Sequence, residues 1–105
     1  MQPDQGLLDD LVRRIREVVE PKRIVLFGSS ARGEMTPDSD LDVLVVVDNA
    51  TDPRSTTRAI YRRLIGFGQA VDVIVATDKE VAEYGDRVGM VYYPALREGR
   101  GIYAA

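Results

Sequence analysis

Apolar residues follow two patterns along the chain, and each pattern predicts a different kind of element. Between residues 7 and 20 they recur at intervals of three and four, with charged residues between them, which predicts an amphipathic helix that Pro21 ends. A short apolar run at 24–27 predicts a buried strand, as do the segments 41–47 and 71–76, which are apolar except for one aspartate each. Because the run at 41–47 is dominated by β-branched Val, we expect it to be a central strand covered on both faces.

The segments between these runs predict turns and a second helix. Residues 29–33 follow the first strand through a sharp turn at Gly28, and residues 33–39 contain Gly, Pro, Asp and Ser, as loops do. Asp52-Pro53 indicates a helix start, and glycines at 66 and 68 close that helix. Its apolar face consists of Ile60, Tyr61, Leu64 and Phe67.

The last third of the chain has a weaker pattern. A short helix is expected through Tyr84, with Thr77 and Asp78 as candidate caps. Part of 86–98 is expected to be helical, although Pro94 limits any continuous helix, and residues 101–103 suit an edge strand. Helices and strands alternate throughout, which predicts a single α/β or α+β domain over the 105 residues.

The composition restricts the chemistry that this domain can perform. The chain has no Cys, no His and no Trp. A disulfide framework, a thiolate nucleophile, an imidazole base and metal sites built from Cys or His are therefore excluded. Catalysis by this chain would depend on carboxylates, hydroxyls, arginine and bound metal.

The net charge and the length of the apolar runs indicate which partners and which location to expect. A formal net charge of −3 is unlike the strong basic excess of nucleic-acid-binding domains, so no direct nucleic-acid binding is expected. The longest apolar run falls far short of the roughly 20 residues of a membrane span, and the first ten residues are acidic rather than a basic, apolar export signal. We therefore expect a soluble, cytoplasmic protein without a membrane partner.

Three aspartates form the most informative constellation. Side chains alternate along a strand, so Asp40 and Asp42 point the same way, about 6.6 Å apart. Asp72 interrupts another apolar strand and shares a face with Ile74, so a neighbouring strand in suitable register would add a third carboxylate. Three carboxylates about 4 Å apart repel by some 4 kcal/mol per pair at an effective dielectric near 20. Protonation of one would relieve this, but Mg²⁺ carrying a phosphate ester is the better answer.

The turn before these aspartates has the residues of a phosphate-binding loop. Gly28 lets the backbone come close to a ligand, the Ser29 hydroxyl adds a donor, and amides near Ser30 and Ala31 can face phosphates. Arg32 suits either of two roles, a contact with a phosphate oxygen or a surface ion pair with Glu34 or Asp38.

Together these residues resemble a known family. Gly28-Ser29, ten intervening residues and Asp40-x-Asp42, set in Gly-Ser-Ser-Ala-Arg-Gly and Ser-Asp-Leu-Asp, are similar to the nucleotidyltransferase domain of the DNA polymerase beta superfamily. The chain length resembles the minimal nucleotidyltransferases, which act as antitoxins beside an all-helical HEPN toxin. The resemblance extends from the strand at Ile24 through Asp72, and weakly to Glu98-Gly99 and Ile102-Tyr103.

The resemblance implies a fold, a reaction and a partner. The fold is a small mixed β-sheet flanked by helices. Asp40, Asp42 and Asp72 would hold Mg²⁺, with two ions expected, and Gly28, Ser29, Ser30, Arg32 and Ser39 would bind ATP. In the antitoxin members AMP is transferred to a tyrosine of the partner toxin, which silences the toxin. We therefore expect a protein adenylyltransferase that works in a hetero-oligomeric complex with its HEPN partner.

Two other functions stay open on the residues alone. The chain could neutralise its partner by binding and masking it without catalysis, or it could nucleotidylate a small molecule, although relatives that do so usually carry an additional domain. The basic helix residues Arg58, Arg62 and Arg63 suit a solvated or ion-paired face better than a partner surface. Tyr92 and Tyr93 suit a core position and a partner surface equally.

Overall fold

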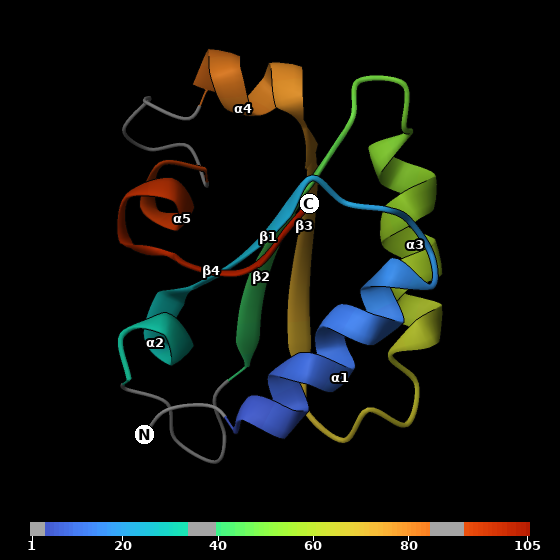
Figure 1. The fold of residues 1–105 in the computed structure, drawn as a ribbon, viewed down its shortest axis with the longest axis vertical. Helices are drawn as coiled ribbons and strands as arrows, with labels where there is room; N and C mark the ends of the chain where they lie inside the picture. Colours follow the sequence, from blue (N-terminus) through green and yellow to red (C-terminus); the bar gives the residue numbers. More distant parts are fainter. Residues whose placement is uncertain (1–3, 34–39, 85–91) are drawn as a thin grey trace.

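The computed structural model describes residues 4–33, 40–84 and 92–105, in which helices and strands alternate (Figure 1). The helices are α1 (Gln5–Arg16), α2 (Gly28–Ala31), α3 (Pro53–Arg63), α4 (Asp78–Tyr84) and α5 (Tyr92–Glu98). The strands are β1 (Arg23–Phe27), β2 (Leu41–Val47), β3 (Val71–Thr77) and β4 (Arg100–Ala104). None of the described helices is long and apolar enough to cross a membrane.

The four strands form one mixed sheet in the order β3-β2-β1-β4. Strands β2 and β3 run parallel, whereas β1 runs antiparallel to both β2 and β4. The predicted central strand at 41–47 is confirmed to the residue, since β2 pairs on both sides and its residues 43–47 are all buried. The predicted mixed sheet with flanking helices is thus present.

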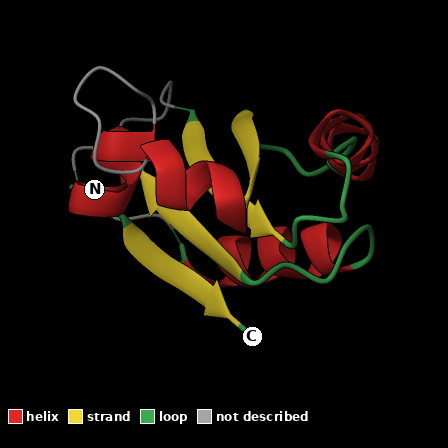
Figure 2. Ribbon diagram, turned by 90° about the horizontal axis from the view of Figure 1, so that it is seen from above, coloured by secondary structure: helices red, strands yellow, loops and turns green. Residues whose placement is uncertain are grey.

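Helices cover both faces of the sheet (Figure 2). Helices α1 and α3 pack on one face, where Leu11, Ile15 and Ile60 meet the side chains of Leu41, Val43, Val45 and Val47. Helices α4 and α5 lie on the other face, over a smaller cluster that includes Val25, Leu44, Val46 and Ala95. The side chains of β2 alternate between the two faces of the sheet, so odd-numbered residues of this strand enter the first cluster and even-numbered ones face the second.

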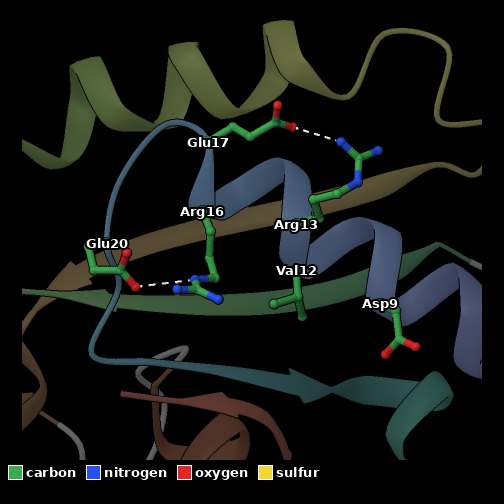
Figure 3. A pocket seen from close by; sticks show the side chains of 6 residues that line it. All are labelled: Asp9, Val12, Arg13, Arg16, Glu17 and Glu20. Atoms are coloured by element: carbon green, nitrogen blue, oxygen red, sulfur yellow. Dashed lines mark hydrogen bonds and ion pairs between the residues drawn. The ribbon is translucent and has the colours of Figure 1, made fainter.

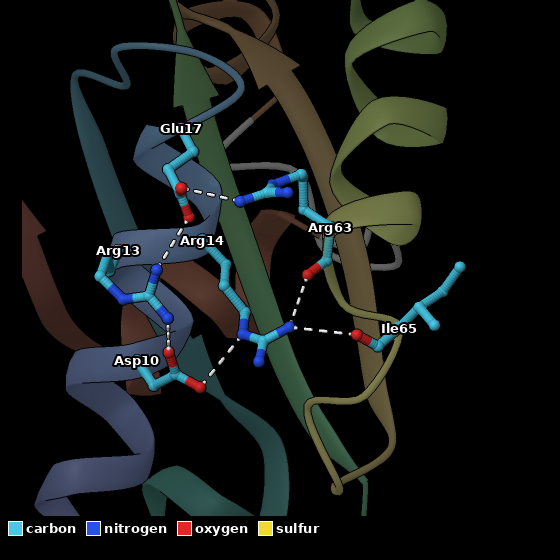
Figure 4. Close-up of polar contacts among 6 residues, drawn as sticks. All are labelled: Asp10, Arg13, Arg14, Glu17, Arg63 and Ile65. Carbon is cyan, nitrogen blue, oxygen red and sulfur yellow. Dashed lines mark hydrogen bonds and ion pairs between the residues drawn. The ribbon is translucent and has the colours of Figure 1, made fainter.

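A polar network joins α1 to the end of α3 (Figure 4). The Arg14 guanidinium donates to the backbone carbonyls of Arg63, at 2.7 Å, and Ile65, at 3.2 Å, and Nε donates to Asp10. Arg63 is the last residue of α3 and Ile65 lies in the turn after it, and backbone acceptors at a helix end lack helical partners. Glu17 accepts from the Arg63 side chain at 2.7 Å, so Arg63 is ion-paired as expected.

One predicted boundary differs from the structure for a local reason. Helix α1 ends at Arg16 rather than at residue 20, while Val18 and Val19 still pack against the core from the following turn. Their apolar character reflects burial and not helical continuation. The predicted partial helix within 86–98 is present as α5, and Pro94 is its third residue, where a backbone N–H has no helical acceptor to lose.

Candidate functional site

Three of the predicted site residues, Gly28, Asp42 and Asp72, lie where β1 ends and where β2 and β3 begin. In the sheet register Phe27 lies opposite Asp42, and Asp42 lies opposite Asp72 on the parallel strand β3. Gly28 follows Phe27 directly. The fold therefore brings together three stretches of sequence that are far apart along the chain, at the lower end of the sheet in Figure 1.

Asp42 and Asp72 share one face of the sheet. Their strand neighbours Leu44 and Ile74 pack into the cluster under α4 and α5, while Leu41, Val43 and Val73 point into the opposite core. Asp42 is half-buried, and Asp72 and Asp40 are exposed. The predicted shared face of Asp72 and Ile74 is confirmed.

The carboxylates interact electrostatically. Burial raises the pKa of Asp42 above its ordinary value, and the negative charges of Asp72 and Asp40 raise it further. The Arg32 guanidinium partly opposes this pKa shift. The half-buried carboxylate thus lies in a field that disfavours its charge, which a bound cation would relieve.

The donor set fits a hard divalent cation in chemistry, since it offers carboxylate oxygens on adjacent strands. Within the described residues, however, no group of three acidic side chains has a geometry ready to hold a metal ion. The assignment of Asp40, Asp42 and Asp72 as magnesium ligands therefore stays a prediction.

Gly28 is the residue at which the turn touches the carboxylates. Its φ of +72° lies in the left-handed region, which disfavours residues with a side chain. A Cβ at this position would stand 2.5 Å from Asp42 Oδ2. Glycine is thus required here twice, for the backbone conformation and for the close approach to Asp42.

The other predicted nucleotide-binding residues have different surroundings. Ser29 is half-buried in the first turn of α2, beside the carboxylates. Ser30 is fully buried, and its hydroxyl donates to the Phe27 carbonyl at 3.2 Å, so its side chain secures the turn and any contact with a ligand would come from its backbone amide. Ser39, together with the loop at 34–39, lies outside the described residues.

Arg32 faces both the carboxylates and the end of α5. Its guanidinium lies 3.7 Å from a carboxylate oxygen of Glu98, with both side chains largely exposed. The sequence prediction considered Glu34 and Asp38 as ion-pair partners, and both lie outside the described residues. Glu98 was not predicted as the partner of Arg32, because only the fold brings the end of α5 next to α2. The adjoining Gly99 allows this close packing, since a Cβ there would overlap the Ala95 carbonyl and Val25.

A cavity lies elsewhere on the described part of the chain (Figure 3). It has a volume of about 390 Å³ and follows the outer side of α1 and the turn after it, away from the face that carries Asp42. No predicted site residue lines it, and ion pairs occupy much of its wall. Its lining residues are Asp9, Val12, Arg13, Arg16, Glu17 and Glu20.

Residues 8–94 match the nucleotidyltransferase domain family. The matched range includes the turn at Gly28 and all three aspartates. The chain belongs to this family. The predicted enzyme class, a nucleotidyltransferase, is confirmed by this match, as is the resemblance to the minimal nucleotidyltransferases.

Known relatives and solved structures agree with this membership. A Methanocaldococcus jannaschii protein named a protein adenylyltransferase is 31% identical over 83 residues, which are 78% of each chain. A toxin–antitoxin crystal structure with AMP-PNP has a TM-score of 0.67 at 16% identity, covering 93% of this chain and 73% of that one. A variant of the toxin–antitoxin pair MntA-HpeT, with two aspartates replaced by glutamate, has a TM-score of 0.66 at 14% identity with the same coverage.

A further structural neighbour aligns with this chain over nearly the full length of both chains. It is the crystal structure of a Sulfolobus solfataricus nucleotidyltransferase, with a TM-score of 0.55 at 20% identity, covering 99% of this chain and 92% of that one. At these levels of identity the neighbours show the fold. The predicted nucleotidyltransferase fold is therefore confirmed.

Proposed function

We propose that this nucleotidyltransferase is a magnesium-dependent protein adenylyltransferase that moves AMP from ATP to a tyrosine hydroxyl of a HEPN toxin, and so acts as an antitoxin. The observation that carries the proposal is the sheet register, which sets Asp42 opposite Asp72 and next to the turn at Gly28. That juxtaposition provides a carboxylate pair for metal and a close backbone approach for phosphate within one site. The relative named a protein adenylyltransferase and the toxin–antitoxin neighbour with AMP-PNP support the same reaction and partner class.

Each residue has a distinct part in this reaction. Asp40, Asp42 and Asp72 would hold Mg²⁺, which when bound offsets the charge of the triphosphate and makes the acceptor hydroxyl more acidic. Gly28 and Ser29 would hold the phosphates through the turn, and Arg32 would add positive charge beside them. Asp72 is the exposed member of the pair that it forms with Asp42, and it would accept the proton of the incoming hydroxyl.

The bond changes balance without any further reactant. The acceptor oxygen forms a bond to the α-phosphorus of ATP, the bond between the α-phosphorus and its bridging oxygen to the β-phosphate breaks, and pyrophosphate leaves. The hydroxyl proton passes to Asp72 and then to water. Phosphoryl-type transfer of this kind depends on positioning and charge stabilisation more than on acid–base groups, so a chain without histidine can perform it.

The test is transfer of label from ATP. The full chain is incubated with Mg²⁺, ATP labelled at the α-phosphate and the HEPN-type protein encoded beside it, and the labelled residue is mapped. We expect label on a tyrosine of that protein, and loss of labelling by at least about 100-fold in Asp42→Asn and Asp72→Asn. Asp48→Asn is the matched control, because Asp48 follows the opposite end of β2.

The same experiment separates the alternatives. Absence of label with the intact chain would contradict the proposal. If Asp42→Asn abolished labelling but still protected cells from the partner, masking by binding would be the better account. Labelling of small alcohols in the absence of any protein would instead indicate a small-molecule nucleotidyltransferase.

A further inference from the structure

The outer side of β3 is held by a side chain rather than by another strand. Among the described residues β3 pairs only with β2, which leaves alternate backbone groups of β3 facing outward. The outward N–H of Val73 donates to the hydroxyl of Tyr61 at 2.9 Å. This hydrogen bond links the last turns of α3 to the peptide that directly follows Asp72.

The location of this bond matters because Asp72 lies at the start of its strand. It is the second residue of β3, and the preceding chain is a turn in which Gly66 and Gly68 both have positive φ. Strand ends of this kind open most readily, since few hydrogen bonds must break. A displacement of the peptide between Asp72 and Val73 would move Asp72 relative to Asp42, its partner in register.

Packing alone does not explain a tyrosine at this position. The neighbouring Ile60 fills the core beneath α3, whereas Tyr61 is 40% exposed and was predicted from the sequence as part of the apolar face. If the ring served only to cover the sheet edge, phenylalanine would do the same. The hydroxyl is the part of the side chain that reaches the β3 backbone.

We propose that Tyr61 is a positioning residue that fixes the Asp72–Val73 peptide and thereby keeps Asp72 opposite Asp42. The inference rests on the proposed function, in which both carboxylates hold the metal. Tyr61 touches neither the nucleotide nor the acceptor in this proposal. It acts through the backbone of β3.

Tyr61→Phe tests the proposal, and Tyr103→Phe is a matched control. Tyr103 lies on β4 at the opposite edge of the sheet, and its hydroxyl donates to Glu20 at 2.8 Å, so each variant removes one hydroxyl and one hydrogen bond. Four quantities are measured on the full chain: hydrogen exchange of the Val73 amide, Mn²⁺ affinity, kcat, and KM for ATP. Urea unfolding of both variants checks that they are folded.

The two variants should differ at the site and not in the fold. In Tyr61→Phe we expect faster exchange at Val73, weaker Mn²⁺ binding and a roughly tenfold lower kcat at an unchanged KM for ATP, because misplacement near reacting groups acts mainly on the transition state. Tyr103→Phe should leave Mn²⁺ affinity and kcat within about twofold of wild type.

Other results overturn the proposal. Faster exchange at Val73 with unchanged kcat and Mn²⁺ affinity would mean that the bond only covers the sheet edge. An equal loss of kcat in both variants would indicate a general effect on stability. If the wild-type chain transfers no AMP, the proposed function fails, and Mn²⁺ affinity alone tests the role of Tyr61. Weaker Mn²⁺ binding in Tyr61→Phe than in wild type and Tyr103→Phe would support positioning of Asp72. Equal Mn²⁺ affinity in all three proteins, or no Mn²⁺ binding by any of them, would refute it.

Discussion

Replacement of Gly28 by alanine tests whether the turn is built against Asp42. The added Cβ would stand 2.5 Å from Asp42 Oδ2, on a backbone whose φ is +72°. A left-handed conformation costs a residue with a side chain about 1–2 kcal/mol, and displacing the Asp42 side chain from its rotamer costs about 0.5–1.5 kcal/mol. Alanine also lowers the conformational entropy of the unfolded chain, which offsets about 0.4–1 kcal/mol of this loss in stability.

These contributions predict a net loss of about 0.5–3 kcal/mol in the free energy of unfolding. For a chain of this length, a loss of 2 kcal/mol corresponds to a fall of roughly 10 °C in Tm. Urea unfolding of metal-free protein measures the change. The same variant should lose the proposed adenylyl transfer, because Asp42 is displaced from the position that the proposed metal site requires.

Gly66→Ala separates the two causes. Gly66 has a similar φ of +84°, but a Cβ there would meet nothing within 4 Å, so this variant carries the backbone effect alone. The difference between the two variants therefore measures the contact with Asp42. Combining Gly28→Ala with Asp42→Ala should remove that difference, as expected for two residues in direct contact. If Gly28→Ala is no more destabilised than Gly66→Ala, the close approach to Asp42 has no energetic consequence and the reasoning is refuted.

Two further predictions concern charge. The pKa of Asp42 is higher in the folded protein than in the unfolded chain. At pH values between the unfolded and the folded pKa, the folded protein therefore binds more protons, and its stability falls as pH rises through this window. Metal-free Asp42→Asn should therefore have a higher Tm than wild type at pH 7, with the gain vanishing at pH values below the ordinary pKa of aspartate; a gain independent of pH would contradict this origin. Arg14→Met should lower the free energy of unfolding, measured in urea, by about 1.5–3 kcal/mol, because it removes the charged hydrogen bonds to the carbonyls of Arg63 and Ile65. Arg13→Met is its control, since the ion pairs of Arg13 are exposed and are expected to contribute about 0–1 kcal/mol; equal losses in the two variants would show that the carbonyl contacts do not matter.

Much of this arrangement was predictable because strong local patterns determine it. The apolar segment 41–47 gave the bounds of β2 correctly, since a strand covered on both faces is apolar at nearly every position and Asp42 is its single polar residue. The alternation of side chains in β3 also predicted which face Asp72 shares. Both predictions depend on the two-residue period of a strand, which is directly readable from the residues.

The parts that were missed depend on contacts between distant segments. Burial of Ser30 and its hydrogen bond to Phe27 reflect the tight turn after β1, and a serine in sequence does not reveal which way its hydroxyl points. The ion pair of Arg32 with Glu98 requires α5 to pack next to α2. The role of Tyr61 requires α3 to lie along the open edge of β3, whereas its spacing in sequence indicates only an apolar face.

The pairing of β4 with β1 also constrains how the chain reaches this fold. Arg23 lies opposite Ala104, so nearly the whole described chain must be traversed before the fourth strand can join the sheet, whereas β1 and β2 are joined through a short connection. Loop closure becomes less favourable by about 0.6 kcal/mol for each doubling of loop length. We therefore expect the hairpin of β1 and β2 to form first, with the turn at Gly28 and Asp42 assembled in the early folding nucleus and β4 added last. The turn that we propose to bind phosphate would then begin to take shape before the sheet around it is complete.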